Sequence, residues 1–233
     1  MIELSGAVKR YRHASVLNGI TLTIDQPGIY CLLGRNGAGK TTLLKSIAGY
    51  QNLSGGTVAV NGKTVTTAAM DPGVSYIENF AKHFNLPVRT LVELAGDLNP
   101  SYDYDFAREM MDRFELDQRK KFKQLSLGMK TMVSTIICLA SNKDVILLDE
   151  PVLGFDAIMR MEFYDMLTES YQRKPRIIIV STHIIEEIAK TIQKLMILDR
   201  GSIRFFDTMD AIGGDSLQDF FVQMVQGKGG SAK

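Results

Sequence analysis

The chain has 233 residues, of which 27 are basic and 26 acidic, and 45% of them are hydrophobic. This length can bury a sizeable core in one compact unit, and the balanced charge excludes a broad cationic face of the kind that binds nucleic acid. No apolar stretch approaches the roughly 20 residues that span a bilayer, and no basic-then-apolar leader opens the chain, so we expect a cytosolic protein.

The N-terminal part of the chain carries alternating patterns that predict β-structure. One such pattern runs from Ile2 to Ile24, with a turn signal at Asn18-Gly19. A shorter segment from Thr57 to Val60 ends at a second turn signal, Asn61-Gly62. These segments predict a small β subdomain.

A glycine-rich sequence lies between a predicted strand, Ile29 to Leu33, and a helical pattern that starts near Leu43. Glycines let the backbone close around phosphate oxygens, the helix start directs N–H groups at them, and a lysine adds positive charge. The sequence therefore predicts a nucleoside triphosphate site, with the Thr41 hydroxyl on a magnesium ion. The residues expected to bind the nucleotide are Gly34, Asn36, Gly37, Ala38, Gly39, Lys40, Thr41 and Thr42.

The second half of the chain predicts a helical block followed by a parallel sheet. Helical periodicity begins near Leu91, and we place the block over residues 76–140, between core segments 1–75 and 141–226. Two continuous apolar runs follow, Val145 to Leu148 and Ile177 to Val180, with a helix from Met159 to Tyr171 between them. Such runs are typical of strands buried on both faces. Residues 227–233 have little to bury and predict a mobile tail.

Polar residues follow both apolar runs, at the sheet edge where α/β proteins bind ligands. Asp149 and Glu150 end the first run, and Ser181-Thr182-His183 ends the second. Asp149 is the natural partner of magnesium, directly or through water. Glu150 is placed to accept a proton from the water that attacks the γ-phosphate, and His183 to contact that phosphate. A structural role for His183 remains the alternative.

The six residues from Leu125 to Lys130, Leu-Ser-Leu-Gly-Met-Lys, open a predicted helix. With the phosphate loop, the acidic strand end and the late histidine in this order, they resemble the signature motif of ABC-type ATPases, usually written Leu-Ser-Gly-Gly-Gln. The resemblance covers essentially the whole chain. It implies an α/β P-loop NTPase fold with a parallel-sheet RecA-like subdomain, an antiparallel β subdomain and an α-helical subdomain that bears the signature.

This resemblance also implies how the protein assembles. Family members form a head-to-tail dimer that sandwiches two ATP molecules, so Ser126 and Gly128 would bind the γ-phosphate held by the opposite chain. Tyr11 occupies the position of an aromatic ring that stacks on adenine, although a place in a strand core is the alternative. Asp156, in Gly154-Phe155-Asp156, matches the loop that lets the two sites communicate.

The chain departs from the family pattern at two places. In the signature, Leu127 replaces a glycine and Met129 replaces the glutamine, a variant that resembles some bacterial antibiotic and peptide exporters. Where the family has a glutamine that senses the γ-phosphate and the membrane subunit, this chain has Glu78 and Asn79. We expect Asn79 to contact the metal, with Glu78 as the less favoured candidate, because asparagine keeps the amide chemistry but is one methylene shorter.

The resemblance is to Ytr-type and bacitracin-type exporter ATPases, and it predicts a transport-coupled ATPase that uses ATP and Mg²⁺. Its expected partners are an integral membrane permease and a second copy of the chain, with a related ATPase as the alternative subunit. It would lie in the cytoplasm, on the inner face of the cell membrane, and move a peptide, antibiotic or similar amphipathic compound outward. The alternatives are a soluble ABC ATPase of DNA or ribosomes, a phosphate-loop kinase and a silent nucleotide-binding module.

Overall fold

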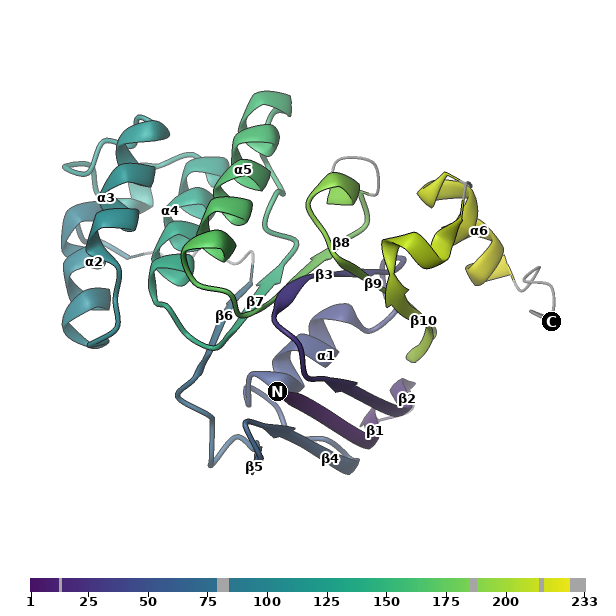
Figure 1. Ribbon diagram of the computed structural model, residues 1–233. Helices are drawn as coiled ribbons and strands as arrows, with labels where there is room; N and C mark the ends of the chain where they lie inside the picture. Colours follow the sequence, from purple (N-terminus) through teal and green to yellow (C-terminus); the bar gives the residue numbers. More distant parts are fainter. Residues whose placement is uncertain (13, 79–83, 185–187, 214–215, 227–233) are drawn as a thin grey trace.

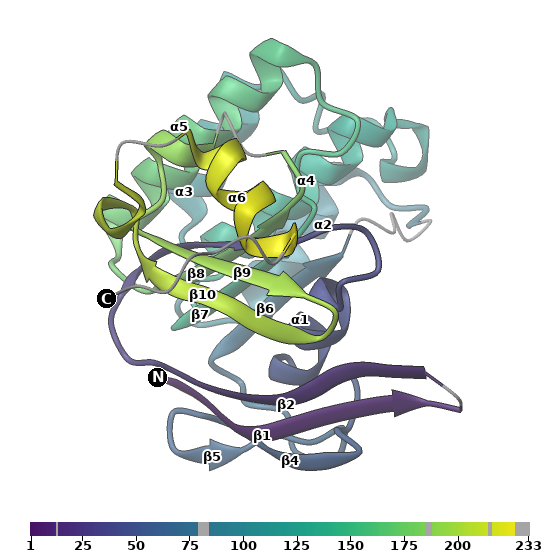
Figure 2. The same cartoon turned by 90° about the vertical axis from the view of Figure 1, so that its right-hand side faces the viewer.

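The computed structural model describes residues 1–12, 14–78, 84–184, 188–213 and 216–226. The expected tail, residues 227–233, therefore lies outside the described residues. The described part consists of a large sheet carrying helices, a smaller sheet near the N-terminus and a helical block (Figures 1 and 2). This arrangement is the expected α/β fold with its antiparallel β part and its helical part.

The larger sheet has six strands in the order β10-β9-β3-β8-β7-β6. Neighbouring strands are parallel except for the edge pair β9 and β10. The strands are β3 (Gly28–Leu33), β6 (Val74–Glu78), β7 (Val145–Asp149), β8 (Ile177–Thr182), β9 (Lys194–Asp199) and β10 (Ser202–Thr208). The strands β3, β7 and β8 are buried along their whole length, which explains their continuous apolar sequences. Both predicted parallel strands, β7 and β8, are confirmed.

The smaller sheet is antiparallel and has the order β2-β1-β4-β5. Its strands are β1 (Ile2–Tyr11), β2 (Ala14–Ile24), β4 (Gly55–Val60) and β5 (Lys63–Thr64). The predicted turn at Asn61-Gly62 is confirmed, because it joins β4 to β5 with φ angles of 51° and 75°. Positive φ at both central residues is what the tightest hairpin turns require.

The turn expected at Asn18-Gly19 is wrong, because Gly19 lies inside β2. The chain reverses earlier, between Tyr11 and Ala14. The register explains the glycine: Ala7 pairs with Ile20, and the next residue of β1 pairs with Asn18, so Gly19 is an extra residue in the ladder. Its φ of +75° is that of a β-bulge glycine. The same sequence signal therefore marks a bulge here and not a hairpin turn.

The helices are α1 (Lys40–Ile47), α2 (Val88–Asp97), α3 (Tyr104–Arg113), α4 (Leu127–Ala140), α5 (Ala157–Arg173) and α6 (Leu217–Gln226). Three short 3₁₀ helices are η1 (Phe122–Gln124), η2 (Ile188–Lys190) and η3 (Met209–Ile212). Helix α1 lies between the two sheets, whereas α4 and α5 lie on the other face of the larger sheet (Figure 1). The expected boundary between residues 75 and 76 falls inside β6, a strand of the core.

Alternate residues of each central strand serve two separate cores. In β3, Ile29, Cys31 and Leu33 pack with α3, α4 and α5, whereas Tyr30 and Leu32 pack with α1 and the smaller sheet. Burial raises the pKa of the Cys31 thiol to about 12, and it does the same for Cys138 in α4. Both cysteines are free, so they act as small apolar residues of the core.

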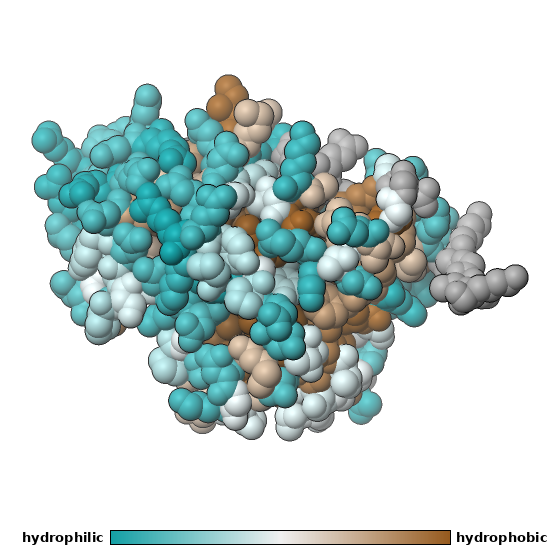
Figure 3. All heavy atoms as spheres, viewed as in Figure 1, coloured by the Kyte–Doolittle hydropathy of each residue, from teal (hydrophilic) through white to brown (hydrophobic). Residues whose placement is uncertain are grey.

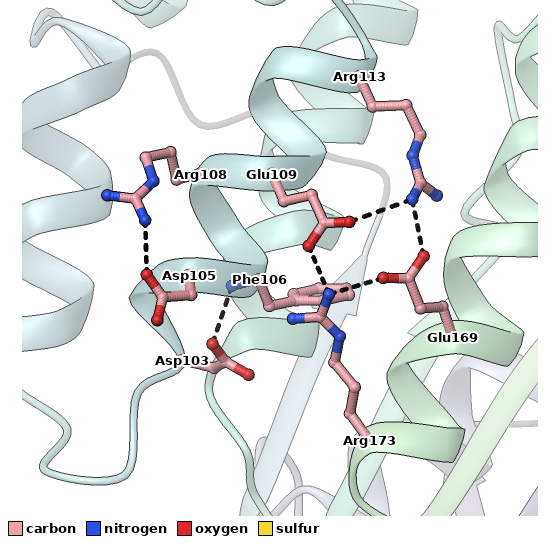
Figure 4. Close-up of polar contacts among 8 residues, drawn as sticks. All are labelled: Asp103, Asp105, Phe106, Arg108, Glu109, Arg113, Glu169 and Arg173. Carbon is pink, nitrogen blue, oxygen red and sulfur yellow. Dashed lines mark hydrogen bonds and ion pairs between the residues drawn. The ribbon is translucent and has the colours of Figure 1, made fainter.

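Four charged side chains join helix α3 to helix α5 (Figure 4). Arg113 lies 2.8 Å from one carboxylate oxygen of Glu169, and Arg173 lies 2.8 Å from the other. Both arginines also meet Glu109 of α3. The Arg173 guanidinium lies over the Phe106 ring, 5.2 Å from its centroid. This network ties the helical block to a helix of the nucleotide-binding core.

In the space-filling view, hydrophilic residues cover the helical end of the molecule on the left (Figure 3). Hydrophobic residues gather near β9, β10 and α6, where Phe205 and Phe220 stack edge to face at 4.8 Å. Within the described residues, no helix is both long and apolar enough to cross a membrane.

Candidate nucleotide site

The glycine-rich loop leaves β3 and turns into helix α1 at Lys40. Gly37 and Gly39 have φ angles of +82° and +109°, a region that side chains strongly disfavour. A Cβ at Gly39 would also lie 2.8 Å from the carbonyl oxygen of Val16 in β2. The two glycines therefore let the loop curl closely over the start of α1, where N–H groups and the helix dipole favour an anion.

A hollow of about 350 Å³ opens at this loop. It is lined by Val16, Arg35, Asn36, Gly37, Gly39, Lys40, Thr41, Thr42 and Glu150. The structure therefore brings most of the expected nucleotide-binding residues together around one space. Gly34 and Ala38 serve the loop differently. The Gly34 carbonyl accepts from Lys40 Nζ at 2.7 Å, and the Ala38 carbonyl accepts from the Gly201 N–H at 3.0 Å.

Glu150 links the phosphate loop to the end of β8. Its Oε1 lies 3.2 Å from Lys40 Nζ, and its Oε2 lies 2.9 Å from His183 Nδ1. The Glu150 N–H is shared by the carbonyl and the hydroxyl of Ser181, at 3.2 and 3.0 Å. Glu150 has a φ of +49°, which is uncommon for a residue with a side chain. This strained turn aims the carboxylate at the hollow, between two nitrogen groups.

Asp149 and Thr41 supply the oxygen atoms expected at a magnesium site. Asp149 ends β7, is 6% exposed, and accepts a hydrogen bond from the Ser181 hydroxyl. Thr41 is exposed at the rim of the hollow. The described residues contain no group of three or more His, Cys, Asp or Glu that could hold a metal by itself. Mg²⁺ commonly uses one or two protein oxygens together with phosphate, so this donor set fits it. Asn79 lies outside the described residues.

Glu78, the alternative to Asn79, ends β6 beside Asp149 of β7. Its carboxylate pairs with Lys45 of α1 and accepts from the Tyr76 hydroxyl at 3.3 Å. Burial and the nearby carboxylates of Asp149 and Glu78 raise the pKa of Tyr76, so its phenol stays protonated and donates. Glu78 does not line the hollow at the phosphate loop but lines a second hollow, together with Tyr50, Tyr76 and Leu91.

Tyr11, the expected adenine-stacking residue, ends β1 and is 46% exposed. Its hydroxyl hydrogen-bonds to the Gln51 side chain, whose amide donates to the Thr42 carbonyl at 2.6 Å. Lys9 Nζ lies 5.0 Å from the centre of the ring. The tyrosine is thus tied to the phosphate-loop helix through one intermediate residue. A ring this exposed is available to a planar ligand, unlike a residue of the strand core.

The signature residues lie elsewhere, at the start of α4. The Ser126 hydroxyl caps this helix by accepting from the Met129 N–H at 3.2 Å. Gly128 is buried against the loop after Glu150, since a Cβ there would lie 2.8 Å from the Gly154 carbonyl oxygen. Leu127 is 49% exposed. None of these three residues lines the described hollow of their own chain.

Asp156 caps the next helix, because its carboxylate accepts from the Met159 N–H at 2.9 Å at the start of α5. The loop that carries Asp156 thus begins at Glu150, touches Gly128 and ends in a helix cap. Sequence reasoning identified the residues of this loop but not its contact with the signature. It also assigned no role to Ser181, whose hydroxyl holds both Asp149 and the Glu150 N–H.

The family model described as ABC transporter matches residues 17–153. The chain is 28% identical over 226 residues to the ABC transporter ATP-binding protein YtrB of Bacillus subtilis, covering 96% of this chain and 76% of YtrB. It is also 28% identical to the Nod factor export ATP-binding protein I of Burkholderia orbicola, over 86% of this chain and 68% of that protein. The taurine import ATP-binding protein TauB of Escherichia coli O157:H7 is 28% identical as well, over 90% and 84% of the two chains.

Solved structures share the fold. A structure described as the ATP-binding subunit of an ABC transporter aligns with a TM-score of 0.85 at 24% identity, covering 96% of this chain and 99% of that one. The cassette MJ0796, described as dimeric in a post-hydrolysis state with ADP and Pi, aligns with a TM-score of 0.77 at 21% identity. That alignment covers 90% of this chain and 99% of MJ0796.

Proposed function

The chain belongs to the ABC transporter family, as an ATP-binding subunit and ATPase, and we propose that it powers export of a peptide, antibiotic or similar amphipathic compound through a separate permease. The likeness of its signature to that of antibiotic and peptide exporters supports outward transport. Similarity to a Nod factor export protein supports it too, whereas similarity to a taurine import protein points the other way. The direction of transport and the substrate are therefore proposed here, whereas the family model shows that the chain is an ABC ATPase.

The observation that carries the mechanism is the position of Glu150 between Lys40 and His183 at the hollow. We assign Glu150 as the base that accepts a proton from the attacking water. Lys40 and His183 then stabilise the negative charge that develops on the phosphate oxygens. Because ATP brings phosphate oxygens to Lys40, these oxygens compete with the Glu150 carboxylate for the ammonium group.

Three side chains are assigned to a magnesium ion, which neutralises charge on the phosphate oxygens when bound. They are Thr41, Asp149 and Asn79. Ser181 supports this assignment for Asp149, because its hydroxyl fixes one carboxylate oxygen and leaves the other to face a ligand. Tyr11 is assigned to the adenine ring, which its exposed face can meet.

The position of the signature residues supports a site that two chains share. Ser126 and Gly128 bind phosphate in this proposal, yet they do not line the hollow of their own protomer. A head-to-tail dimer resolves the difference, because each signature then completes the site of the opposite chain. Two identical copies suffice, since one chain carries Glu150, His183 and the signature. Asp156 lies on the loop between Glu150 and the signature, which suits communication between the two sites.

The permease partner places the protein on the inner face of the cell membrane. We assign docking of the permease to the helical block, which contains α2, α3 and α4. The network of Arg113, Glu169 and their neighbours supports this assignment, because it ties α3 to the core and so transmits movement between them.

The test uses the Glu150→Gln variant, which is expected to bind ATP and to remain a closed dimer because hydrolysis is blocked. The variant is isolated with ATP from gently solubilised membranes of the source organism, and the mass of the complex is measured. A polytopic membrane protein in a complex with two copies of this chain is the expected result. Recovery only with nucleic acid or ribosomes, or turnover equal to wild type, would overturn the proposal. Accumulation of peptide antibiotics in cells that lack the chain tests the direction.

A further inference from the structure

The segment that follows helix α1, residues 51–54, lies beside the end of β1. The Ser54 N–H donates to the Val8 carbonyl at 2.7 Å, and the Arg10 N–H donates to the Ser54 hydroxyl at 3.0 Å. The last residue of β1 is Tyr11, the side chain assigned to the adenine ring. Residues 51–54 therefore connect the strand end that carries this ring to the helix that begins at the phosphate loop.

Gln51 makes this connection through its side chain. Its Nε2 donates to the Thr42 carbonyl at 2.6 Å and to the Ser46 hydroxyl at 3.2 Å, and its Oε1 accepts from the Tyr11 hydroxyl. A backbone carbonyl can only accept, so the NH₂ group of the amide must face Thr42, and the amide oxygen is left for the phenol. One half-buried side chain thus fixes the tip of the tyrosine ring relative to α1.

Thr42 extends the connection to the hollow at the phosphate loop. Thr42 lines this hollow, and its carbonyl holds Gln51. Tyr11 does not line the hollow itself. A ligand that meets both places therefore needs an anionic end for the hollow and a planar end for the ring, as a nucleoside triphosphate has. The tie through Gln51 sets the orientation of one place relative to the other.

Lys9 lies over one face of the Tyr11 ring. Its Nζ is 5.0 Å from the ring centroid and donates to the Asn52 carbonyl at 2.6 Å. The π electrons of the ring attract an ammonium group in this position, which holds the plane of the ring. The tyrosine is nevertheless 46% exposed, and the face opposite Lys9 is where a planar base would stack. Gln51 thus fixes the tip of the ring, and Lys9 fixes its plane.

We propose that Gln51 and Lys9 are positioning residues for nucleotide binding, which hold the Tyr11 ring in the orientation that the base requires before ATP arrives. The inference rests on the proposed adenine role of Tyr11 and adds the residues that orient the ring. Fixing a side chain in advance strengthens binding, because its freedom is no longer lost when the ligand binds. The expected contribution is about three- to tenfold in affinity, and it acts on the base and not on the phosphates.

The first experiment separates the base from the phosphates. Gln51→Leu keeps the approximate size of the side chain and removes its hydrogen bonds, whereas Tyr11→Phe keeps the ring and removes only the hydroxyl. The dissociation constants of ATP and of inorganic tripolyphosphate, which lacks a base, are measured with Mg²⁺ for the full chain. We expect each variant to weaken ATP binding about three- to tenfold and to leave tripolyphosphate binding unchanged. Gln223→Leu, at an exposed position of α6, is the matched control and should change neither constant.

The double variant Gln51→Leu/Tyr11→Phe tests whether the two residues act through one hydrogen bond. If they do, the double variant binds ATP as Gln51→Leu does, because the second change removes nothing further. Losses that multiply would overturn the inference. Urea unfolding of the nucleotide-free protein checks that each variant folds. Tyr11→Phe removes a single oxygen atom and reports on the same hydrogen bond if Gln51→Leu does not fold.

A second measurement needs no nucleotide. Fluorotyrosine replaces Tyr11, and its ¹⁹F resonance is recorded in the otherwise wild-type chain and with Gln51→Leu, Lys9→Met or Lys9→Arg. We expect one narrow resonance in the wild-type background and a shifted or broadened one with Gln51→Leu or Lys9→Met, because the ring then samples several orientations. Lys9→Arg should keep the wild-type resonance and ATP affinity, since a guanidinium can also lie over the ring and donate to the Asn52 carbonyl.

Tyr11→Ala distinguishes failure of this inference from failure of the proposed adenine role. If Tyr11→Ala weakens ATP binding while Gln51→Leu has no effect, the inference is overturned and the role of Tyr11 stands. If Tyr11→Ala leaves ATP binding unchanged, the assignment of this ring to adenine is itself refuted. Equal losses of ATP and tripolyphosphate binding in Gln51→Leu would make Gln51 a support of α1 and the phosphate loop, which also overturns the inference.

Discussion

Lys40 and Glu150 form an ion pair, 3.2 Å apart, across the hollow at the phosphate loop. Lys40 is 7% exposed and Glu150 is 22% exposed, so water screens the pair less than it would a surface pair. The lysine expected to bind phosphate and the glutamate expected to activate water thus form an ion pair with each other. Both must change partners when ATP enters, which makes each a sensitive position for mutation.

The Lys40→Met variant should lose about 10²- to 10³-fold in the rate of ATP hydrolysis, because it removes the positive charge that stabilises the transferred phosphate. ATP affinity should fall as well. Steady-state phosphate release and nucleotide titration measure the two effects. Lys63→Met, at an exposed lysine of β5, is the matched control and should behave as wild type. A Lys40→Met rate within threefold of wild type would contradict the assignment.

His183→Ala should lower kcat about 10²-fold with a smaller effect on KM, because the imidazole acts on the developing charge and orients Glu150 through its 2.9 Å contact. His183→Gln keeps a side-chain amide at this place and should recover part of the rate. If both variants turn over ATP at the wild-type rate, the histidine is only a structural residue of the strand end. Steady-state kinetics at saturating Mg²⁺ distinguish these outcomes.

Ser181→Ala should raise the Mg²⁺ concentration needed for half-maximal hydrolysis about tenfold. The hydroxyl fixes the Asp149 carboxylate and accepts from the Glu150 N–H, so its loss disorders the proposed metal ligand without removing it. Magnesium titration of the ATPase measures the shift. Thr168→Ala, which removes a hydroxyl bonded to the Tyr164 carbonyl in α5, is the control. An unchanged dependence of hydrolysis on Mg²⁺ concentration would show that Ser181 does not position a ligand of the metal.

Gly128→Ala should reduce the free energy of unfolding by about 1–3 kcal/mol, because the new Cβ would meet the Gly154 carbonyl oxygen at 2.8 Å. A backbone atom cannot rotate away as a side chain can, so the start of α4 must shift. Urea unfolding of the nucleotide-free protein measures the loss. Leu127→Ala, at the adjacent half-exposed position, should cost less than about 1 kcal/mol. Equal losses would exclude a packing role for Gly128.

Glu169→Gln should lower the free energy of unfolding by about 1 kcal/mol at pH 7. Burial alone would raise the pKa of Glu169, but Arg113 and Arg173 outweigh burial and hold it below its usual 4.5. A carboxyl with a lowered folded pKa stabilises the protein above the unfolded pKa and loses this effect as pH falls through the folded value. The difference between variant and wild type should therefore vanish in acid.

The control for Glu169 lies in the same region of the molecule (Figure 4). Arg108 and Asp105 form a 2.7 Å pair, but their side chains are 72% and 82% exposed. Arg108→Gln should change the free energy of unfolding by less than about 0.5 kcal/mol, and the change should be smaller still in high salt. If Glu169→Gln lowers the free energy of unfolding by the same amount at acidic and neutral pH, packing and not charge joins α3 to α5.

Sequence patterns were sufficient for the buried parallel strands and the phosphate loop. Continuous apolar runs identified β7 and β8 because both faces of these strands are covered, and three glycines with one lysine identified the loop because its backbone geometry demands them. The same reasoning failed at Gly19. A glycine with positive φ suits either a hairpin turn or a bulge, and only the pairing of β1 with β2 decides between them.

The site could be predicted where a residue's role depends on its own chemistry, as for Lys40 or Glu150. It could not be predicted where the role depends on residues distant in sequence. Ser181 follows Asp149 by 32 residues, and only the parallel register of β7 and β8 sets them side by side. The contact of Gly128 with Gly154 is of the same kind, because the start of α4 meets a loop and neither sequence shows a sign of the contact.

The contact between Gly128 and Gly154 would affect when each of two ATP sites hydrolyses its nucleotide. In the proposed dimer, the loop that begins at Glu150 would lie at the nucleotide of its own chain. A few residues later this loop lies against Gly128, whose helix start would face the nucleotide of the other chain. In the proposed dimer, a change at Glu150 during hydrolysis would reach the opposite site through a backbone contact, because the Gly154 carbonyl lies against Gly128. Two copies of this chain would then hydrolyse ATP in alternation or together, but not independently of each other.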